Sequence, residues 1–496
     1  MAPVETKIAP RGDKIFFRGD ALRPHQISPV ADLVGLLSAG QNAIDISDCG
    51  TGKTYVAAAV AKTLARPTLA VVPKITQSQW RKAAAHFDDT LSVTGYEALR
   101  TGRTPFGTWD NNPPPGFKSE TWFKCQCCQR EVDMDNYVPC YCHPAGVHCL
   151  ETKKVPWKYG RFNFHPGIEF LIMDEVHRCG AMDSLNADML IAAKRQGIRI
   201  LGLSATAACG PLQMRALGFA LGLHNLADFY AWTRRYGCGK IDGVPGWHWK
   251  AGKDRQVEFM RKLNAEIIPS RGVRVRVNDI PNFPKRIVDC RLFDLDEAGR
   301  IDALYDEMRI PLDILAKRTS RDAASDHPLT MQLRMMQKIE ILKVPLLTEL
   351  VPDYVAKGYS VGVFCNFQQT IDELRKRLHC DCVIDGSVTG AARDRSVERF
   401  QSADARVMLL NSEAGGVGLD LPDLTGEHPR VGLVLPPRSA RTFKQLISRF
   451  HRESSKSTCV YNVLLAAGSK EVSIHNKVMA KVDNLDALND GDFLPD

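Results

Sequence analysis

A short apolar segment that runs into a glycine-rich turn and then into a helix constrains the fold of this chain most strongly. Residues 43–47 read AIDIS, residues 48–54 read DCGTGKT, and the helical segment YVAAAVAKTLA follows. In such a turn the backbone N–H groups and the helix N-terminus bind phosphate oxygens, the lysine reaches the terminal phosphates, and the threonine hydroxyl holds magnesium. Ser47 stands where the strict pattern has glycine, so an ordinary strand-to-helix turn is the alternative. We predict a nucleoside triphosphate site at Gly50, Thr51, Gly52, Lys53 and Thr54.

A second apolar segment ends in two adjacent carboxylates. Residues 169–173 read EFLIM, and Asp174 and Glu175 follow. By position, Asp174 should hold the magnesium, while Glu175 should orient and polarise the water that attacks the γ-phosphate. The alternative is a solvated strand end. It is disfavoured because the strand is apolar and lies downstream of the phosphate-binding turn.

With these two motifs in order, the chain resembles a superfamily two helicase, in which residues 174–177 (DEVH) occupy the position of the DEAH or DEXH box. Residues 203–206 (LSAT) resemble the third motif of that superfamily, whose hydroxyl groups are implied to couple hydrolysis to movement. Residues 22–26 (LRPHQ) resemble the adenine-reading segment of the Snf-type branch. This resemblance implies that Gln26 contacts adenine in ATP.

Two further segments of the first half resemble nucleic-acid-tracking motifs of the same branch. They are residues 71–74 (VVPK) with Gln79 and Trp80, and residues 92–99 (SVTGYEAL). The resemblance implies that both contact the sugar-phosphate backbone and not the bases.

The second half continues the series of helicase motifs. Residues 358–378 and 405–422 resemble the fourth and fifth motifs, and residues 445–456 (QLISRFHRESSK) resemble the sixth. In the sixth motif two arginines one helical turn apart, here Arg449 and Arg452, are implied to point at the nucleotide held by the other lobe, where guanidinium groups stabilise the developing charge. A solvated basic helix face is the alternative. The departures from the family pattern, which leave the subfamily open, are Asp420, Ser448, Glu453 and Ser454.

Residues 210–232 and 267–308 resemble the Snf-type sequence that follows the third motif, in which the first segment is helical. In the second segment, Arg271, Arg274 and Arg276 are interleaved with valines. This alternation predicts a strand with one cationic face, either a DNA contact or a solvated surface.

Composition is that of a globular protein with two or three domains. The chain has 496 residues, of which 44% are hydrophobic and 25% charged. A net charge of +8 favours a polyanionic partner. The charges of Arg11, Asp13, Lys14 and Arg18 exclude a secretory signal in the first twenty residues, and no long uncharged apolar stretch exists. We therefore expect an intracellular protein, cytoplasmic or nuclear, that is not secreted and has no membrane partner.

Six of the fifteen cysteines fall between residues 125 and 149. Cys125 and Cys128 form a CxxC pair, and Cys140 and His143 form a CxxH pair, which together can close a tetrahedral zinc site. Disulfides are disfavoured in an intracellular protein. We predict that zinc folds an insertion at residues 101–160. The residues that could replace one of these four ligands, or bind a second ion, are Cys127, Cys142, His148 and Cys149.

The predicted fold is α/β, with two RecA-like parallel-sheet ATPase lobes and helical Snf-type elements. The first lobe spans residues 1–286 and is interrupted by the zinc-binding insertion at 101–160, and the second spans residues 287–496. ATP and magnesium are expected between the lobes. The favoured function is that of a Snf-type ATP-dependent translocase on nucleic acid, with duplex DNA preferred. The alternatives are a strand-separating DNA or RNA helicase and a zinc-dependent nucleic-acid-binding scaffold with a vestigial ATPase.

Overall fold

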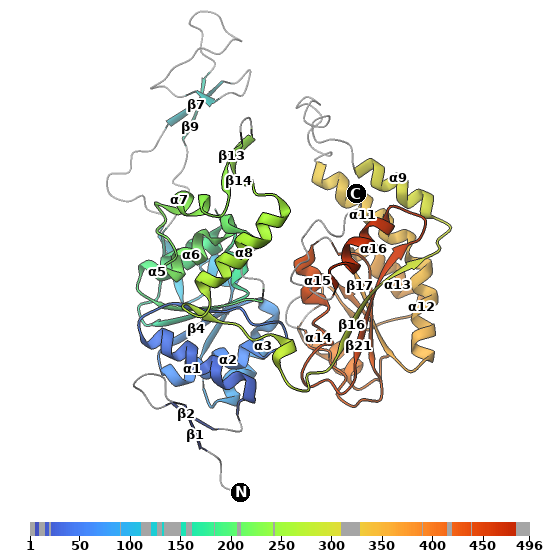
Figure 1. Cartoon of the computed structure of the whole chain (residues 1–496), viewed down its shortest axis with the longest axis horizontal. Coiled ribbons are helices and arrows are strands. Elements are labelled where there is room, and N and C mark those ends of the chain that lie inside the picture. The colour runs from blue at the N-terminus through green and yellow to red at the C-terminus, as the bar shows by residue number, and fades with distance from the viewer. Residues whose placement is uncertain are drawn as a thin grey trace, which may run out of the picture.

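Two six-stranded parallel sheets organise the chain into two lobes (Figure 1). The structure is a computed structural model. It describes residues 5–8, 15–18, 21–89, 91–110, 121–125, 131–132, 150–154, 161–182, 184–205, 210–241, 244–308, 328–388, 390–413, 419–437 and 439–482. The predicted α/β fold with two RecA-like lobes is confirmed.

The sheet of the first lobe has the strand order β15-β3-β12-β11-β4-β5, and all neighbours are parallel. Its strands are β3 (Ala43–Asp45), β4 (Thr68–Val72), β5 (Ser92–Gly95), β11 (Phe170–Asp174), β12 (Arg199–Leu203) and β15 (Gly272–Val273). Parallel strands bring their carboxyl ends to one edge, where ligands bind in open α/β sheets. The phosphate-binding turn after β3 and the carboxylates after β11 therefore share an edge.

Both faces of this sheet are buried, which explains why its central strands β4, β11 and β12 are mostly apolar. Alternate residues of one strand lie in different core clusters: Leu69 and Val71 belong to one, Ala70 and Val72 to the other. One face is covered by α1 (Pro24–Ser38), α2 (Lys53–Leu64) and α3 (Gln77–His86), and the other by α5 (Leu185–Arg195), α6 (Arg215–Leu221) and α8 (Lys253–Ile267).

The chain leaves the first lobe after α4 (Tyr96–Arg100) through β6 (Gly107–Asp110) and returns through β10 (Arg161–Phe164), which is antiparallel to it. Between them, β7 (Thr121–Cys125) pairs with β8 (Glu131–Val132) and β9 (Leu150–Lys154). The backbone of Cys125 ends β7, but its side chain and the residues Cys128, Cys140 and His143 lie outside the part that the structure describes. The zinc site therefore stays a prediction.

The segment after β12 is helical, as expected for residues 210–232, and then forms a hairpin. Its elements are η3 (Pro211–Met214), α6, α7 (Phe229–Arg234), β13 (Cys238–Ile241) and β14 (Val244–Trp249). The arginine-rich stretch that follows is a strand only at β15, and it then enters the 3-10 turn η4 (Val277–Asp279). At the N-terminus, β1 (Glu5–Ile8) pairs with β2 (Ile15–Arg18).

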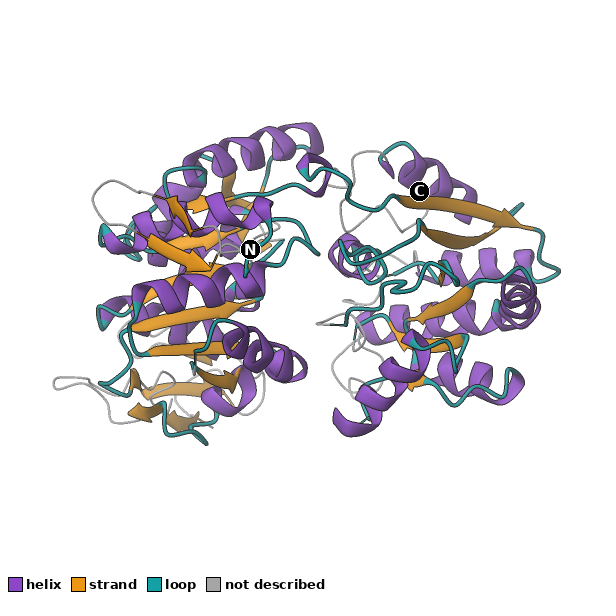
Figure 2. Cartoon of the chain, turned by 90° about the horizontal axis from the view of Figure 1, so that it is seen from below, coloured by secondary structure: helices purple, strands orange, loops and turns teal. Residues whose placement is uncertain are grey.

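The sheet of the second lobe has the order β16-β21-β20-β17-β19-β18 and is also entirely parallel. Figure 2 shows the two lobes side by side, each with strands flanked by helices. Its strands are β16 (Arg286–Phe293), β17 (Ser360–Cys365), β18 (Val383–Ile384), β19 (Val407–Asn411), β20 (Arg430–Val434) and β21 (Cys459–Ala466). Its helices are α9 (Ala298–Met308), α11 (Pro328–Leu342), α12 (Val344–Ala356), α13 (Gln368–Arg377), α14 (Gly390–Gln401), α15 (Ala440–Leu446) and α16 (Glu471–Met479). None of the helices in the described ranges has the length and apolar character needed to cross a bilayer.

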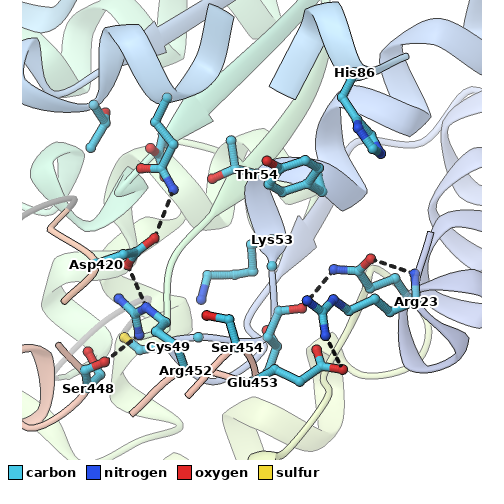
Figure 3. Close-up of a pocket in the computed structure, with 18 of the residues that line it drawn as sticks. Arg23, Cys49, Lys53, Thr54, His86, Asp420, Ser448, Arg452, Glu453 and Ser454 are labelled. Carbon is cyan, nitrogen blue, oxygen red and sulfur yellow. Dashed lines mark hydrogen bonds and ion pairs between the residues drawn. The ribbon is translucent and has the colours of Figure 1, made fainter. Parts of the chain in front are cut away.

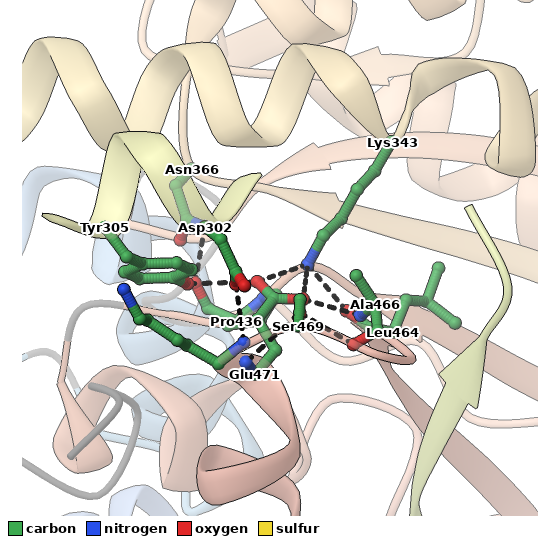
Figure 4. A network of polar contacts seen from close by, with 10 residues as sticks. Asp302, Tyr305, Lys343, Asn366, Pro436, Leu464, Ala466, Ser469 and Glu471 are labelled. Atoms are coloured by element: carbon green, nitrogen blue, oxygen red, sulfur yellow. Dashed lines mark hydrogen bonds and ion pairs between the residues drawn. The ribbon is translucent and has the colours of Figure 1, made fainter. Parts of the chain in front are cut away.

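A buried ion pair joins the helices of the second lobe to its sheet (Figure 4). The Lys343 amine lies 2.7 Å from Oε2 of Glu471 and donates to the Leu464 carbonyl at 3.0 Å. Glu471 also accepts from the Tyr305 hydroxyl and the Ala466 N–H. A buried charge is tolerated only when it is paired and hydrogen-bonded in this way. The network fixes α9, α12 and α16 against β21.

Candidate active site

A cavity of about 460 Å³ opens between the lobes (Figure 3). From the first lobe it is lined by the turn after β3, the end of β11 and the start of α1. From the second lobe it is lined by Asp420 and by the segment 445–454. The predicted site residues that line it are Gln26, Gly50, Thr51, Gly52, Lys53, Thr54, Asp174, Glu175, Arg449 and Arg452.

Two glycines shape the turn that precedes α2. Gly50 and Gly52 have φ values of 93° and 85°, in the left-handed region that glycine tolerates. At Gly52 a side chain would also collide, because an added Cβ would lie 2.1 Å from Nε2 of Gln26. Since Gly52 is the N-cap of α2 and supplies no side-chain cap, the first N–H groups of the helix are available to an anion.

Ser47, the departure from the strict phosphate-loop pattern, connects the turn to the arginine-rich stretch by a hydrogen bond. Its hydroxyl accepts a hydrogen bond from the Val275 N–H at 2.9 Å. The Asp48 N–H donates to the Val275 carbonyl, and its carboxylate accepts from the Val277 N–H. A glycine at position 47 would lack the first of these bonds. The arginine-rich stretch therefore continues the edge of the sheet alongside the turn.

The Lys53 amine is held over the turn (Figure 3). It donates to the carbonyls of Ser47 and Asp48, at 2.8 and 3.0 Å. Burial raises the pKa of the nearby Asp45 carboxyl, and the Lys53 charge opposes that shift. An amine bound only by neutral carbonyls can exchange them for phosphate oxygens, which form stronger charge-assisted bonds.

The two carboxylates after β11 have different environments. Asp174 accepts a hydrogen bond from the Trp80 indole at 2.9 Å, and burial, followed by the charge of Glu175, raises its pKa to about 7. Burial acts to raise the pKa of Glu175, but His177, through its hydrogen bond and charge, and the charges of Lys53 and Arg449 together lower that pKa below its ordinary value. Glu175 therefore holds its negative charge at neutral pH.

His177 joins two of the predicted motifs, a role that we did not predict from the sequence. Its Nδ1 lies 3.2 Å from Oε2 of Glu175 and 3.0 Å from the hydroxyl of Ser204. Ser204 follows β12, so the DEVH and LSAT segments touch through this ring. The histidine at the fourth position of DEVH is the sequence feature that could have predicted this role. Thr206 lies outside the described residues.

The expectation that Trp80 and the segment 92–99 contact a sugar-phosphate backbone is wrong for the two aromatic side chains. Trp80 is 0% exposed and Tyr96 is 1% exposed. The Tyr96 hydroxyl donates to the backbone carbonyl of Asp174 at 2.7 Å. Both residues therefore hold Asp174 from within the core, Trp80 through the carboxylate and Tyr96 through the backbone carbonyl. Gln79 lines the nucleotide cavity and lies 3.4 Å from Asp420 of the other lobe.

Gln26 is bound to the phosphate-loop turn through its amide. Its Nε2 donates to the Thr51 carbonyl at 3.1 Å, and its Oε1 accepts from the Arg23 N–H at 3.0 Å. His25 contacts the same carbonyl. Gln26 is also one of the residues that line the cavity.

The two arginines reach the cavity from the second lobe, but they are held differently. Arg449 is 3% exposed and donates to the Leu419 carbonyl at 3.1 Å, while its Nε has no hydrogen-bond partner in the described structure. Burial, followed by Arg452, lowers the pKa of Arg449 to about 10, so it stays charged at neutral pH. Arg452 is tied to the Asp420 carboxylate and the Ser448 carbonyl.

The second lobe touches the turn itself. A Cβ at Gly50 would lie 3.0 Å from both Nη1 of Arg452 and the His451 carbonyl. Glu453, one of the departures from the family pattern, forms an ion pair of 2.6 Å with Arg23 of the first lobe. The structure thus brings all the predicted ATP-site residues to one cavity.

The two lobes and the site between them define an enzyme, an ATPase of the helicase class, and comparisons with known proteins agree. A family model described as the helicase conserved C-terminal domain matches residues 342–454. A protein of Acanthamoeba polyphaga mimivirus whose name is that of an ATP-dependent RNA helicase is 27% identical over 95% of this chain and 84% of its own length.

Other relatives are Snf-type proteins, and the chain covers small parts of them. The DNA repair and recombination protein RAD54-like of Drosophila grimshawi is 30% identical over 26% of this chain and 17% of its own length. Protein CHROMATIN REMODELING 4 of Arabidopsis thaliana is 24% identical over 92% of this chain but 20% of its own length. The sequence is thus similar to superfamily two helicases of the Snf type.

Among solved structures, the SWI2/SNF2 ATPase core of Sulfolobus solfataricus in complex with dsDNA covers 95% of this chain and 94% of its own, at 14% identity and a TM-score of 0.34. The Dbp5 protein of S. cerevisiae bound to RNA and ADP BeF3 covers 89% and 88%, at 11% identity and a TM-score of 0.41. At these TM-scores and identities, the ligands of the two solved structures are not transferred to this chain.

Proposed function

We propose that this enzyme binds ATP and magnesium in the cavity between the lobes and hydrolyses ATP there. The observation that carries the proposal is the meeting of Lys53, the Asp174–Glu175 pair and the two arginines in one cavity. A buried guanidinium with an unused N–H, next to an uncapped helix N-terminus, fits a polyphosphate.

In this proposal the residues that bind ATP, magnesium and the attacking water each have a defined role. Lys53 and the N–H groups of the turn bind the β- and γ-phosphates, and Thr54 and Asp174 hold magnesium. Magnesium, when bound, neutralises phosphate charge. Glu175, kept anionic by His177, orients the water that attacks the γ-phosphate. Arg449 stabilises the charge that develops on the transferring group.

We infer further that ATP hydrolysis drives movement along nucleic acid, with duplex DNA as the preferred track. The RAD54-like and chromatin-remodelling relatives support this Snf-type reading. The net charge of +8 favours a polyanionic partner. Closing the lobes completes the site and opening them resets it, so nucleic acid gripped by both lobes is advanced stepwise.

A strand-separating DNA or RNA helicase is the second candidate, because the mimivirus relative, which matches 95% of this chain and is matched over 84% of its own length, carries the name of an RNA helicase. The test measures ATP hydrolysis with blunt duplex DNA, single-stranded DNA and RNA. We expect duplex DNA to stimulate the rate most. Stimulation by RNA alone would overturn the preference for DNA, and hydrolysis that no nucleic acid stimulates would favour the scaffold with a vestigial ATPase.

We also propose that residues 101–160 bind zinc through Cys125, Cys128, Cys140 and His143. The pairing of Lys124 with Glu131 supports this, since Cys125 ends β7 and the rest of the CxxC sequence falls between two strands that pair. A short turn between paired strands can present two ligands to one ion. Metal analysis of the purified chain, with Cys128→Ser as the variant, tests the ligand set.

A further inference from the structure

An aromatic and cationic surface lies on the first lobe, outside the ATP site. The rings of Tyr230, on α7, and Trp247, on β14, are stacked with centroids 4.6 Å apart and planes 22° apart. The guanidinium of Arg234, one helical turn after Tyr230, lies over the Trp247 ring at 5.3 Å. We call these three residues the stacking surface. Figure 1 shows its hairpin extending away from the sheet, on the same side of the lobe as β7 and β9.

The stacking surface is exposed and positively charged. Tyr230 is 41% exposed, and among the described residues it is the one aromatic side chain in the group of exposed large hydrophobic residues. The exposed cations on α7 and the hairpin, or directly after them in the sequence, are Arg234, Arg235, Lys240 and Lys250. In the described part of the chain, none of these four forms an ion pair with a carboxylate. Neither ring belongs to a core cluster, so packing of the lobe does not account for the stack.

The hairpin that carries Trp247 is anchored firmly to the lobe. Two residues further along β14, the Trp249 indole donates to the Tyr236 carbonyl at 2.7 Å. The Trp249 ring also covers Gly210, where an added Cβ would lie 2.9 Å from it. Gly210 begins the segment after the LSAT motif, whose Ser204 contacts His177. The surface is thus held near the motif that touches the catalytic carboxylate.

We propose that the stacking surface binds an unpaired nucleobase, so that the substrate of this ATPase is a nucleic acid in which a single strand adjoins a duplex. The proposal rests on the proposed function and deepens it. Aromatic rings stack on bases of any sequence, and unpaired cations beside them bind the backbone phosphates. A blunt duplex offers no unstacked base, so the surface distinguishes a junction from continuous duplex DNA.

The first experiment uses the full chain and a duplex with a single-stranded overhang that carries 2-aminopurine. Stacking should quench the fluorescence of this base when the protein binds. Tyr230→Ala and Trp247→Ala should each remove the quenching and weaken binding of the overhang substrate at least about 5-fold, the lower end of alanine effects at stacked bases. Tyr230→Phe, which keeps the ring, should behave like the wild type.

The matched control is Leu185→Ala, which removes another exposed hydrophobic side chain of the same lobe, 43% exposed, away from the hairpin. It should change neither quenching nor affinity. Binding of blunt duplex and basal ATP hydrolysis should be unchanged in all four variants. An alanine variant that also loses blunt-duplex binding and basal ATP hydrolysis is misfolded. The comparison of wild type with Tyr230→Phe, and the quenching seen with the wild type, then test whether the surface binds a base.

The outcomes separate this inference from the proposed function. If nucleic acid stimulates the wild-type ATPase but 2-aminopurine is not quenched, the stacking surface is overturned while the motor stands. The surface then has another occupant, such as a protein partner. If no nucleic acid stimulates hydrolysis and none binds, the proposed function fails first.

Discussion

Arg449 gives the sharpest test of the active site, because the structure separates it from Arg452. Arg452 is committed to Asp420 and to the Ser448 carbonyl, whereas Arg449 makes one hydrogen bond, to Leu419, and keeps a buried Nε without a partner in the described residues. We therefore expect Arg449 to be the group that is free to bind the transferring phosphoryl group. Arg452 should act mainly in holding the second lobe against the turn.

The size of the effect follows from the burial of this guanidinium. In a site that excludes water, loss of one positioned donor lowers kcat by about 10²–10³, and loss of an arginine that acts on phosphoryl transfer by about 10³–10⁵. Since Arg449 is 3% exposed, we expect Arg449→Ala to lower kcat at least about 100-fold. Arg449→Lys keeps the charge but loses the planar donors, so its loss should be smaller. ATP affinity should change little, because Lys53 and the turn lie on the other lobe.

The assay is steady-state hydrolysis with saturating nucleic acid, alongside ATP binding followed by a fluorescent analogue. Arg399→Ala, an exposed arginine of the same lobe that pairs with Asp381, is the control and should retain the wild-type kcat. Removal of Arg449 also leaves the Leu419 carbonyl without its partner, so the thermal midpoint of each variant must be recorded. A well-folded Arg449→Ala protein with a kcat within about 3-fold of the wild type would refute the assignment, since that loss is far below the expected range.

Three further outcomes are expected. Lys53→Ala should impair nucleotide binding, whereas Glu175→Gln should retain ATP and lose at least ~100-fold in turnover, as a positioned general base does; equal turnover of Glu175→Gln and wild type would contradict the mechanism. Burial, and then Arg286, lowers the pKa of His451 to about 4, from 6.5. The unfolded chain therefore binds a proton between these pH values that the folded chain excludes. Stability present above pH 6.5 should fall as the pH drops toward 4, and His451→Gln should reduce the fall by roughly 1 kcal/mol at pH 5.5, measured by denaturant unfolding. Removal of zinc by a chelator should unfold residues 101–160 while leaving ATP binding intact, and protease protection of that segment without metal would argue against the zinc site.

Much of the site could be predicted because each motif ends a buried strand. An apolar strand followed by GTGKT, and another followed by DE, must have their polar residues at the carboxyl edge of a parallel sheet. That Arg449 faces the turn from the other lobe does not follow from the strand pattern. It was implied by the resemblance of residues 445–456 to the sixth helicase motif, and the structure places Arg449 in the same cavity as the turn.

The direction of individual side chains could not be predicted in this way. The resemblance identified Trp80 and Tyr96 as members of contact motifs, but it did not say which face of α3 or α4 each occupies. Trp80 points into the core that also contains Ala83 and Ala84, and its indole reaches Asp174. The hydrogen bond from the Val275 N–H to the Ser47 hydroxyl could not be predicted either, since the two residues are far apart in the sequence.

The departures from the family pattern lie where the two lobes meet. Asp420 replaces a neutral amide with a charge, and this charge pairs with Arg452 and contacts Gln79 of the first lobe. Glu453 pairs with Arg23, whose side chain is 51% exposed. Solvent-exposed pairs of this kind contribute about 0–1 kcal/mol each. A contact as weak as that between Glu453 and Arg23, which crosses the lobes, can break and re-form in every cycle, as the opening that we propose after hydrolysis requires. The substitutions therefore affect the contacts at the boundary of the lobes, while the groups that we propose to bind the triphosphate match the family pattern.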